Sequence, residues 1–468
     1  MNMIDPKNMK IAYIGGGSRG WAWKLMRDLA RETDICGTVA LYDIDRKAAE
    51  DNAVIGNYIA ADHEGASPWR YEAADTLEDA LTGAHFIVIS ILPGTFEEMA
   101  SDVHAPEKYG VYQSVGDTTG PGGYVRALRT IPMFETIARA VRDYAPEAWV
   151  INYTNPMAMC VGTLYRVFPG IKAFGCCHEV FGTQELLCRM TEEMLGVTGV
   201  TRSDIKVNVL GVNHFTWLDR ASYKGVDLMP LYRRYAEKYV HSGSPTDDPE
   251  KRRTDVFSSG NQVKFDLFLR TGYIAAAGDR HLAEFCPADW YMKTPEMAEG
   301  WGFHLTPVSW RKNDLVKRLA QSRIYLEHQA PDGVMTLGET GEEGVRQIKA
   351  IMGMGDLVTN VNLPNVGQIP NLPLGTIVET NACFTSDSVR PVMAGPLPAQ
   401  VLELSARPAQ NQTDMVTAVL RRSHEEAFAV FCRDRLLDGM TQEDKRALFD
   451  QMVAATKAYM PEDWDKAL

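Results

Sequence analysis

Four consecutive side chains in the stretch GCCHEV could do chemistry, because each can bind a metal, carry a proton or act as a nucleophile. They are Cys176, Cys177, His178 and Glu179. Taken alone, they are compatible with a disulfide, a metal site, a nucleophile or core packing. Adjacent cysteines rarely satisfy disulfide geometry. The eight irregularly spaced cysteines of this 468-residue chain are typical of free thiols in a reducing compartment. We therefore expect no disulfide in this stretch.

A histidine further along the chain could join Cys177 at a metal. His214, in GVNHFTWL, also follows a β-rich run, so the two side chains could meet, although either could instead be a buried packing residue. The chain has no paired C-x-x-C motif, so a structural zinc site is not indicated. Two protein ligands would leave positions open for substrate oxygens and water. By softness alone, a thiolate ligand favours zinc or another late divalent metal over manganese or magnesium.

A glycine-rich stretch near the start of the chain predicts a dinucleotide site. Gly15, Gly17 and Gly20 fit the spacing G-x-G-x-x-G between a β-rich run and a helical pattern, with Ser18 in the same loop. In such a site the first glycine makes a tight turn and the second lets the pyrophosphate approach the backbone. The third allows helix and strand to pack closely. A purely structural turn is the alternative.

An acidic residue follows the glycines at the place where a ribose would be bound. Asp43 ends the next strand candidate, TVALYD, and a carboxylate there binds a ribose hydroxyl. This favours NAD over NADP, although the neighbouring Arg46 leaves that choice open.

The elements that must position these residues alternate between strands and helices. This alternation predicts a Rossmann-type doubly wound parallel sheet in residues 1–200. The pattern changes after about residue 200, which predicts a second mixed α/β domain in residues 201–468 over the cofactor edge. Ligands bind beyond the carboxyl ends of the strands in such sheets, so the polar residues that follow the strands should converge on one edge. The further strand candidates are residues 85–92, 148–154, 172–177 and 205–212.

Other polar residues could line the same edge. Asn155, in YTNPMA, could bind substrate hydroxyls or form the turn before Pro156. Asp117 lies in the glycine-rich segment GDTTGPGG and could instead be solvated. The segment 268–285 gathers further polar side chains among small residues, which suits a cleft or an exposed polar face equally. Those side chains are Tyr273, Asp279, Arg280 and His281.

Charge and hydropathy exclude several classes of partner. The 61 acidic and 48 basic residues give a net charge of −13, whereas a nucleic-acid partner requires a basic face. No run of about 18 apolar residues could span a membrane, and the polar start resembles no signal peptide. We expect a cytoplasmic protein that binds neither nucleic acid nor membrane.

These motifs together resemble glycoside hydrolase family 4, the NAD- and divalent-metal-dependent glycosidases. The ordered motifs KIAYIGGGS, LYDID, GPGG, INYTNP, GCCHEV, GVNHFTWL and LPNVGQIPNLPLGTIVE span nearly the whole chain. The resemblance implies a Rossmann domain similar to that of lactate and malate dehydrogenases. It also implies NAD and Mn²⁺ as cofactors, Cys177 and His214 as metal ligands, and Asn155 near both cofactor and substrate. It further implies a homodimer or homotetramer, with residues 201–468 serving substrate binding and oligomerisation.

The four residues that begin at Cys177 vary with substrate in this family. CHEV resembles the α-galacturonidase and α-glucosidase-like branch, which points away from phosphorylated sugars. The expected substrate is a small α-linked uronide, and a galacturonide is the first candidate. The alternatives within the family are an α-glucosidase, an α-glucuronidase and an α-galactosidase.

The implied mechanism differs from ordinary two-carboxylate hydrolysis. NAD⁺ takes hydride from sugar C3, and a base then removes the acidified C2 proton while the metal acts as a Lewis acid. The aglycone leaves, water adds at C1 and the hydride returns to C3.

Roles for individual residues follow from the same resemblance. Tyr273 is the candidate base, and Asp117 and Asp279 are alternatives. His178 is a candidate leaving-group acid or, with Glu179, a substrate contact. A uronate carboxylate needs a cationic partner, for which the candidates are Arg126 and Arg280.

Two other classes of function remain open at this point. An NAD-dependent dehydrogenase of a sugar acid or hydroxy acid explains the glycines and Asp43 without requiring a metal. A non-catalytic NAD-sensing protein would bind NAD without turnover.

Overall fold

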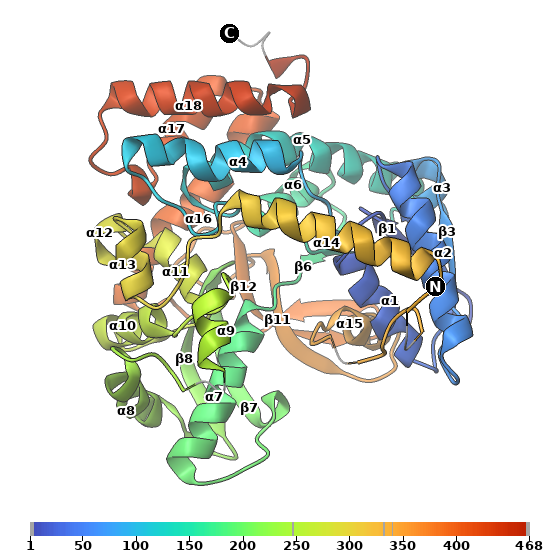
Figure 1. The fold of residues 1–468 in the computed structure, drawn as a ribbon, viewed down its shortest axis with the longest axis horizontal. Coiled ribbons are helices and arrows are strands. Elements are labelled where there is room, and N and C mark those ends of the chain that lie inside the picture. The colour runs from blue at the N-terminus through green and yellow to red at the C-terminus, as the bar shows by residue number, and fades with distance from the viewer. Residues whose placement is uncertain (1–3, 246–247, 331–332, 339, 465–468) are drawn as a thin grey trace.

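A mixed β-sheet forms the centre of the computed structural model, which describes residues 4–245, 248–330, 333–338 and 340–464 (Figure 1). Six of its strands are parallel and lie in the order β3-β2-β1-β4-β5-β6. This is the order of a doubly wound dinucleotide-binding sheet, so the predicted Rossmann-type fold is confirmed. The six strands are β1 (Met9–Ile14), β2 (Gly37–Tyr42), β3 (Arg70–Ala73), β4 (Phe86–Ile89), β5 (Trp149–Asn152) and β6 (Lys172–Gly175).

Helices cover both faces of this sheet, and the strands are apolar on both faces for that reason. Along β1, Ile11 and Tyr13 pack into one hydrophobic cluster, whereas Ala12 and Ile14 pack into another. The first cluster includes side chains of α1 (Trp21–Arg31), α2 (Arg46–Asp62) and α15 (Gly344–Ile351). The second includes those of α3 (Leu77–Leu81), α5 (Gly120–Tyr144) and α6 (Met157–Val167).

The second half of the chain extends the same sheet. Strand β11 (Leu357–Pro364) pairs antiparallel with β6, and β12 (Ile377–Thr385) and β13 (Ser388–Pro391) continue outward from it. The sheet therefore draws strands from both sides of residue 200, and the domain boundary placed there stays a prediction.

One predicted strand is present but pairs in a different sheet from the one expected. Residues 205–212, expected in the parallel series, form β7 (Ile205–Val212) of a separate sheet. The cause is local, because Asn213 and His214 make a two-residue turn, with His214 at φ 62°, and reverse the chain into β8 (Phe215–Tyr223). The other strands of this sheet are β9 (Val226–Asp227) and β10 (Ile274–Ala275).

Helices from distant parts of the chain pack around the two sheets (Figure 1). Helix α14 (Val308–Leu326) runs across the front of the view between α4 (Phe96–His104) and α2. Among the helices of the described residues, none is long and apolar enough to cross a lipid bilayer. The remaining α-helices are α7 (Glu179–Leu195), α8 (Met229–Tyr239), α9 (Pro249–Thr254), α10 (Gln262–Thr271), α11 (Asp279–Phe285), α12 (Ala288–Tyr291), α13 (Pro295–Gly300), α16 (Ala399–Leu420), α17 (His424–Phe431) and α18 (Gln442–Thr456).

Candidate active site

The loop after β1 has the backbone that a bound pyrophosphate requires. Gly15 has φ +93°, and a Cβ there would lie 2.0 Å from the Ser90 carbonyl oxygen. A Cβ on Gly17 would lie 2.6 Å from the Cβ of Ala48. Side chains are excluded at both positions, which leaves the backbone of the loop open to a ligand at the amino end of α1.

The third glycine of the motif does not have the expected packing role. A Cβ on Gly20 would meet only the guanidinium of Arg318, at 2.7 Å, and that group is the flexible end of a long side chain. The close approach to the sheet is made by Gly16, whose Cβ would lie 2.7 Å from the Cβ of Leu41. The packing reason predicted for Gly20 is therefore wrong and belongs to Gly16.

Asp43 reaches back from the end of β2 to the glycine-rich loop. Its Oδ2 accepts a hydrogen bond from the Gly17 N–H at 2.9 Å, and its Oδ1 accepts one from the Asp45 N–H at 2.9 Å. Burial raises the pKa of Asp43 against the effect of these two donors. In the same loop, the Ser18 Oγ accepts a hydrogen bond from the Trp21 N–H at 3.2 Å. The expected elements of a dinucleotide site thus lie together.

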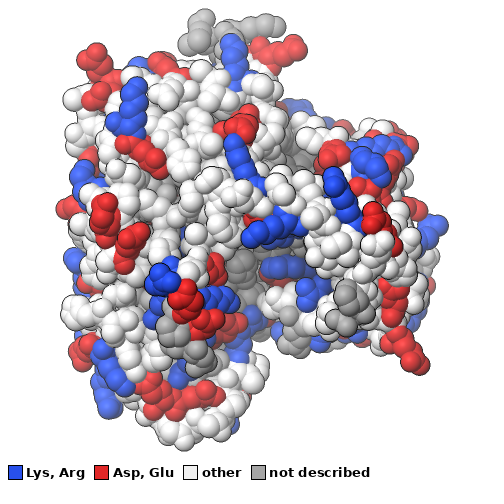
Figure 2. Space-filling model, viewed as in Figure 1, with Lys and Arg blue, Asp and Glu red and all other residues white. Residues whose placement is uncertain are grey.

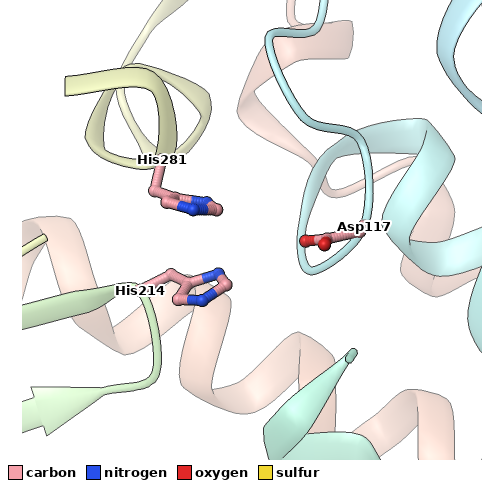
Figure 3. A group of neighbouring side chains, drawn as sticks. All are labelled: Asp117, His214 and His281. Carbon is pink, nitrogen blue, oxygen red and sulfur yellow. The ribbon is translucent and has the colours of Figure 1, made fainter. Parts of the chain in front are cut away.

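Three side chains from distant segments converge on one point (Figure 3). Asp117 comes from the loop before α5, His214 from the β7–β8 turn and His281 from α11. One ligand atom from each lies within 4.8 Å of those of the other two. A carboxylate and two imidazoles at this spacing form a donor set suited to a divalent metal. We call these three residues the donor group.

The charges of Asp117 and His214 suit metal binding, whereas Glu179 raises the pKa of His281 against the effect of burial. Burial alone would raise the pKa of Asp117, but His214, His281 and Arg126 outweigh it and bring that pKa to about 2. Burial and the neighbouring His281 lower the pKa of His214 to about 3. Asp117 is therefore ionised and His214 is neutral near pH 7, which are the forms that coordinate a metal.

Neighbouring residues hold the donor group in place. The Thr118 hydroxyl lies 3.0 Å from Nδ1 of His214, and the Asn155 amide donates to Asp117 Oδ2 at 3.3 Å. The Oδ1 of Asn155 is buried and has no hydrogen-bond partner among the described residues. Arg126 donates from Nε to the Asn155 carbonyl oxygen at 3.1 Å. Asn155 thus presents a free acceptor beside Asp117, as expected of a residue that meets a ligand.

A buried carboxylate fixes the loop that carries Asp117. Glu284 accepts hydrogen bonds from the backbone N–H groups of Val115 at 2.7 Å and of Gly116 at 2.9 Å. Burial raises the pKa of Glu284 to about 7. No sequence pattern predicted this role, because the contact joins residues that lie almost 170 positions apart.

The two adjacent cysteines have different partners. The Cys176 thiol donates to Gln347 at 3.0 Å, away from the donor group. Burial raises the pKa of Cys177 well above its usual value, while a hydrogen bond with Asn213 opposes that effect. Cys177 is not part of the donor group, but this contact brings its thiol to the turn that carries His214. The prediction of Cys177 and His214 as a ligand pair stays a prediction.

A second buried carboxylate supports that turn. Glu379 on β12 accepts hydrogen bonds from Asn213 at 3.3 Å and from Asn360 at 2.7 Å. Burial raises its pKa to about 7. Glu379 therefore connects the extended sheet to the turn between β7 and β8.

His178 and Glu179 begin α7 and line a cavity of about 280 Å³. The Oε2 of Glu179 accepts a hydrogen bond from the Gly278 N–H at 2.6 Å, and its Oε1 lies 3.5 Å from Nε2 of His281. The half-exposed His178 lies between Glu179 and Glu342, at 3.9 and 3.7 Å. Because Glu179 contacts both the cavity and His281, the cavity adjoins the donor group.

The predicted residues of segment 268–285 have mainly structural contacts. Oδ1 of Asp279 accepts a hydrogen bond from the Lys264 N–H, in the first turn of α10, at 3.1 Å. Arg280 donates from Nη2 to the Ser114 carbonyl oxygen at 2.9 Å. Tyr273 packs against a hydrophobic cluster. Their predicted chemical roles stay predictions, whereas His281, which the sequence singled out without a role, joins the donor group.

Comparison with known families explains this arrangement. Residues 10–193 match the model of "Family 4 glycosyl hydrolase", and residues 209–437 match that of "Family 4 glycosyl hydrolase C-terminal domain". The chain belongs to glycosyl hydrolase family 4. The family resemblance and the prediction of a glycoside hydrolase are thereby confirmed, and neither a plain dehydrogenase nor an NAD-sensing protein agrees with this membership.

Curated relatives and solved structures match nearly the full length of the chain. The α-galacturonidase of Thermoanaerobacterium saccharolyticum is 56% identical over 98% of both chains. The crystal structure of lplD from Bacillus subtilis is 50% identical, covers 95% of this chain and 100% of its own, and superposes with a TM-score of 0.90. A 6-phospho-α-glucosidase from gut microorganisms, solved in complex with NAD and Mn²⁺, is 19% identical with a TM-score of 0.81. It covers 97% of this chain and 100% of its own, and shares the fold.

Proposed function

We propose that this family 4 enzyme is an NAD- and metal-dependent α-galacturonidase. The observation that carries the proposal is the contact of Glu179 with both the cavity and His281 of the donor group. A sugar bound in the cavity would place its hydroxyls at the donor group. The 56% identity to an α-galacturonidase over nearly the whole chain supports the same substrate.

The residues present fit a divalent metal at the donor group. Asp117 and His214 have the required protonation states, and Asn155 contributes an unpaired acceptor beside them. We propose His214 as a ligand together with Cys177, with Asp117 and His281 facing the same point. A divalent ion there, for which we propose Mn²⁺, supplies a Lewis acid for sugar oxygens.

The glycine-rich loop fits NAD. Gly15 and Gly17 leave the backbone accessible, and Asp43 lies beside them at the end of β2. When bound, NAD supplies a hydride acceptor that is restored in each turnover. Asn155 follows β5 at the same edge and would contact both the cofactor and the sugar.

The roles in proton transfer are proposed from the family resemblance. We keep Tyr273 as the base at sugar C2, with Asp279 as an alternative. Asp117 remains ionised with a pKa of about 2, which suits a ligand or a base and excludes a proton donor near neutral pH. His178 lies half exposed at the cavity, where it can donate a proton to the leaving aglycone.

We also propose a cytoplasmic location and a homodimeric or homotetrameric assembly. All eight cysteines are free thiols, as in a reducing compartment.

A substrate screen tests the proposed activity. Purified enzyme is supplied with catalytic NAD⁺ and Mn²⁺ and with p-nitrophenyl α-glycosides of galacturonic acid, glucuronic acid, galactose and glucose. We expect p-nitrophenol release fastest from the galacturonide, with no net formation of NADH. Faster release from a neutral glycoside would overturn the proposed substrate. NADH formed in proportion to substrate without bond cleavage would overturn the hydrolase mechanism.

A further inference from the structure

Three cations line the cavity, and two of them are already paired. Lys24 lies 3.0 Å from Glu342, and Arg202 lies 2.6 Å from Glu343. The third cation, Lys264, forms no ion pair among the described residues, and its ammonium contacts the hydroxyl of Thr183. In the view of Figure 2, Lys and Arg side chains border the hollow in the middle of the molecule.

Lys264 is buried deeply for a charged residue. It lies on α10 with 2% of its surface exposed, and its ammonium donates to the hydroxyl of Thr183 on α7 at 3.0 Å. Burial lowers the pKa of Lys264 to about 8, against the effects of Asp279 and Glu179. The side chain therefore remains charged near pH 7. A buried ammonium is costly unless a counter-charge satisfies it.

The two carboxylates that raise the pKa of Lys264 do not contact its ammonium directly. Oδ1 of Asp279 accepts the backbone N–H of Lys264, and its Oδ2 is buried without a hydrogen-bond partner among the described residues. Glu179 directs one oxygen to the Gly278 N–H and the other toward His281. Neither forms an ion pair with the ammonium, so a carboxylate bound in the cavity would be its first direct ionic partner.

We propose that Lys264 binds the carboxylate of the sugar acid and sets the preference of the enzyme for uronides over neutral glycosides. This inference rests on the proposed function. A carboxylate next to the ammonium would complete a charge-assisted hydrogen bond in a site shielded from water. A hydroxymethyl group or an ester at the same place would leave the ammonium buried and unpaired.

Lys264 fits this role better than the two arginines predicted from the sequence. Arg126 donates from Nε to the Asn155 carbonyl oxygen, and Arg280 donates to the Ser114 carbonyl oxygen. Both arginines thus hold backbone segments around the donor group. Each also has one buried nitrogen, Nη1 of Arg126 and Nε of Arg280, without a partner among the described residues, but neither arginine lines the cavity. In contrast, Lys264 is among the residues that line the cavity, together with His178 and Glu179.

A paired substrate test measures the preference directly. The kcat/KM ratio of p-nitrophenyl α-galacturonide to its neutral methyl ester is determined for the wild type, for Lys264→Met and for Lys24→Met. The matched control, Lys24→Met, removes a cation that lines the same cavity but is paired with Glu342. We expect Lys264→Met to lower the ratio by about 100-fold, mainly through KM. The control should keep the ratio within about twofold.

Two further measurements keep the inference falsifiable if Lys264→Met fails to fold, as judged by thermal unfolding and NAD binding. The first is Thr183→Val, which keeps the shape of the side chain but removes the acceptor of the ammonium, and we expect the ratio to fall severalfold. The second is the kcat/KM ratio of the acid to the ester in the wild type, which must favour the acid if the ammonium binds the carboxylate. An unchanged ratio in folded Lys264→Met or in Thr183→Val would overturn the role of Lys264.

The failure of this inference can be told apart from that of the proposed function. A wild type that hydrolyses the acid and the ester equally well would overturn the carboxylate role while leaving the glycosidase in place. A wild type that cleaves neither compound, yet cleaves another α-glycoside, would overturn the galacturonide assignment itself.

Discussion

The glycine-rich loop and the donor group are assembled in different ways. The loop and Asp43 lie within 29 residues of each other, in one strand–helix–strand unit, and their roles depend on backbone conformation. The donor group takes one side chain each from three separate segments, namely Asp117 from the loop before α5, His214 from the β7–β8 turn and His281 from α11. Local sequence therefore determines the cofactor half of the site, whereas tertiary packing determines the half that meets the sugar. Mutations in the glycine-rich loop should therefore impair NAD binding without impairing metal binding, and mutations in the donor group should do the reverse.

The largest expected effect is at the donor group. His214→Ala should lower kcat/KM by at least about 1,000-fold, because it removes a metal ligand at the reacting sugar. Mn²⁺ affinity should fall while NAD affinity stays within about twofold, since the glycine-rich loop is not touched. Calorimetric titration with each ligand separates the two effects, and Cys177→Ser tests the predicted partner in the same way. Mn²⁺ affinity equal to that of the wild type would remove His214 from the ligand set.

Mutation of the glycine-rich loop should instead lower NAD affinity and leave Mn²⁺ affinity unchanged. Gly15→Ala would place a Cβ 2.0 Å from the Ser90 carbonyl oxygen at φ +93°, so the loop must distort at a cost of about 1–3 kcal/mol. NAD affinity should fall by about 10- to 100-fold, and Mn²⁺ affinity should change little. Gly110→Ala is the matched control, because it has φ +71° but no atom near the added Cβ. Equal losses of NAD affinity in both variants would show that the close contact has no influence on binding.

A smaller effect should appear in the pH dependence of substrate preference. The ammonium of Lys264 is present below about pH 8 and is lost as the pH rises through the pKa of about 8. The ratio of kcat/KM for the galacturonide to that for its methyl ester should therefore fall about tenfold per pH unit above that pKa. Asp279, Glu179 and Arg189 also act on Lys264, but they affect both substrates alike. A ratio that stays constant up to pH 10 would contradict the role of Lys264.

The smallest expected effect is a difference in stability between alanine substitutions at two glycines of the glycine-rich loop. Gly20→Ala should change the free energy of unfolding by no more than about 0.5 kcal/mol, because only the mobile end of Arg318 meets the added Cβ. Gly16→Ala should cost about 2 kcal/mol, because its Cβ would overlap Leu41. Urea denaturation of both variants measures the difference. The reverse order would restore the packing role to Gly20.

The sequence was sufficient for the features that depend on neighbouring residues. The parallel strands, the glycine-rich loop and Asp43 followed from periodicity and from the conformational demands on glycine. The ordered motifs were sufficient for the family. The strand at 205–212 was assigned to the wrong sheet because two polar turn residues decided its pairing, and an apolar run alone does not specify its neighbour.

Long-range partners could not be predicted in the same way. Lys264 lies in the helical stretch NQVKFDLFLRT, where a lysine normally faces solvent, and its burial and its contact with Thr183 of α7 arise only in the tertiary structure. Glu284 and Glu379 gave no signal because their partners lie far away in the chain. His281 was noticed among its polar neighbours, but its pairing with Asp117 and His214 required the tertiary structure.

Hydrolysis of p-nitrophenyl α-galacturonide in D₂O tests the central claim most directly. If the sugar is transiently oxidised at C3 and deprotonated at C2, the proton returned to C2 comes from solvent. We therefore expect deuterium at C2 of the released galacturonic acid by NMR, with no accumulation of NADH. Released galacturonic acid that retains hydrogen at C2 would contradict the account.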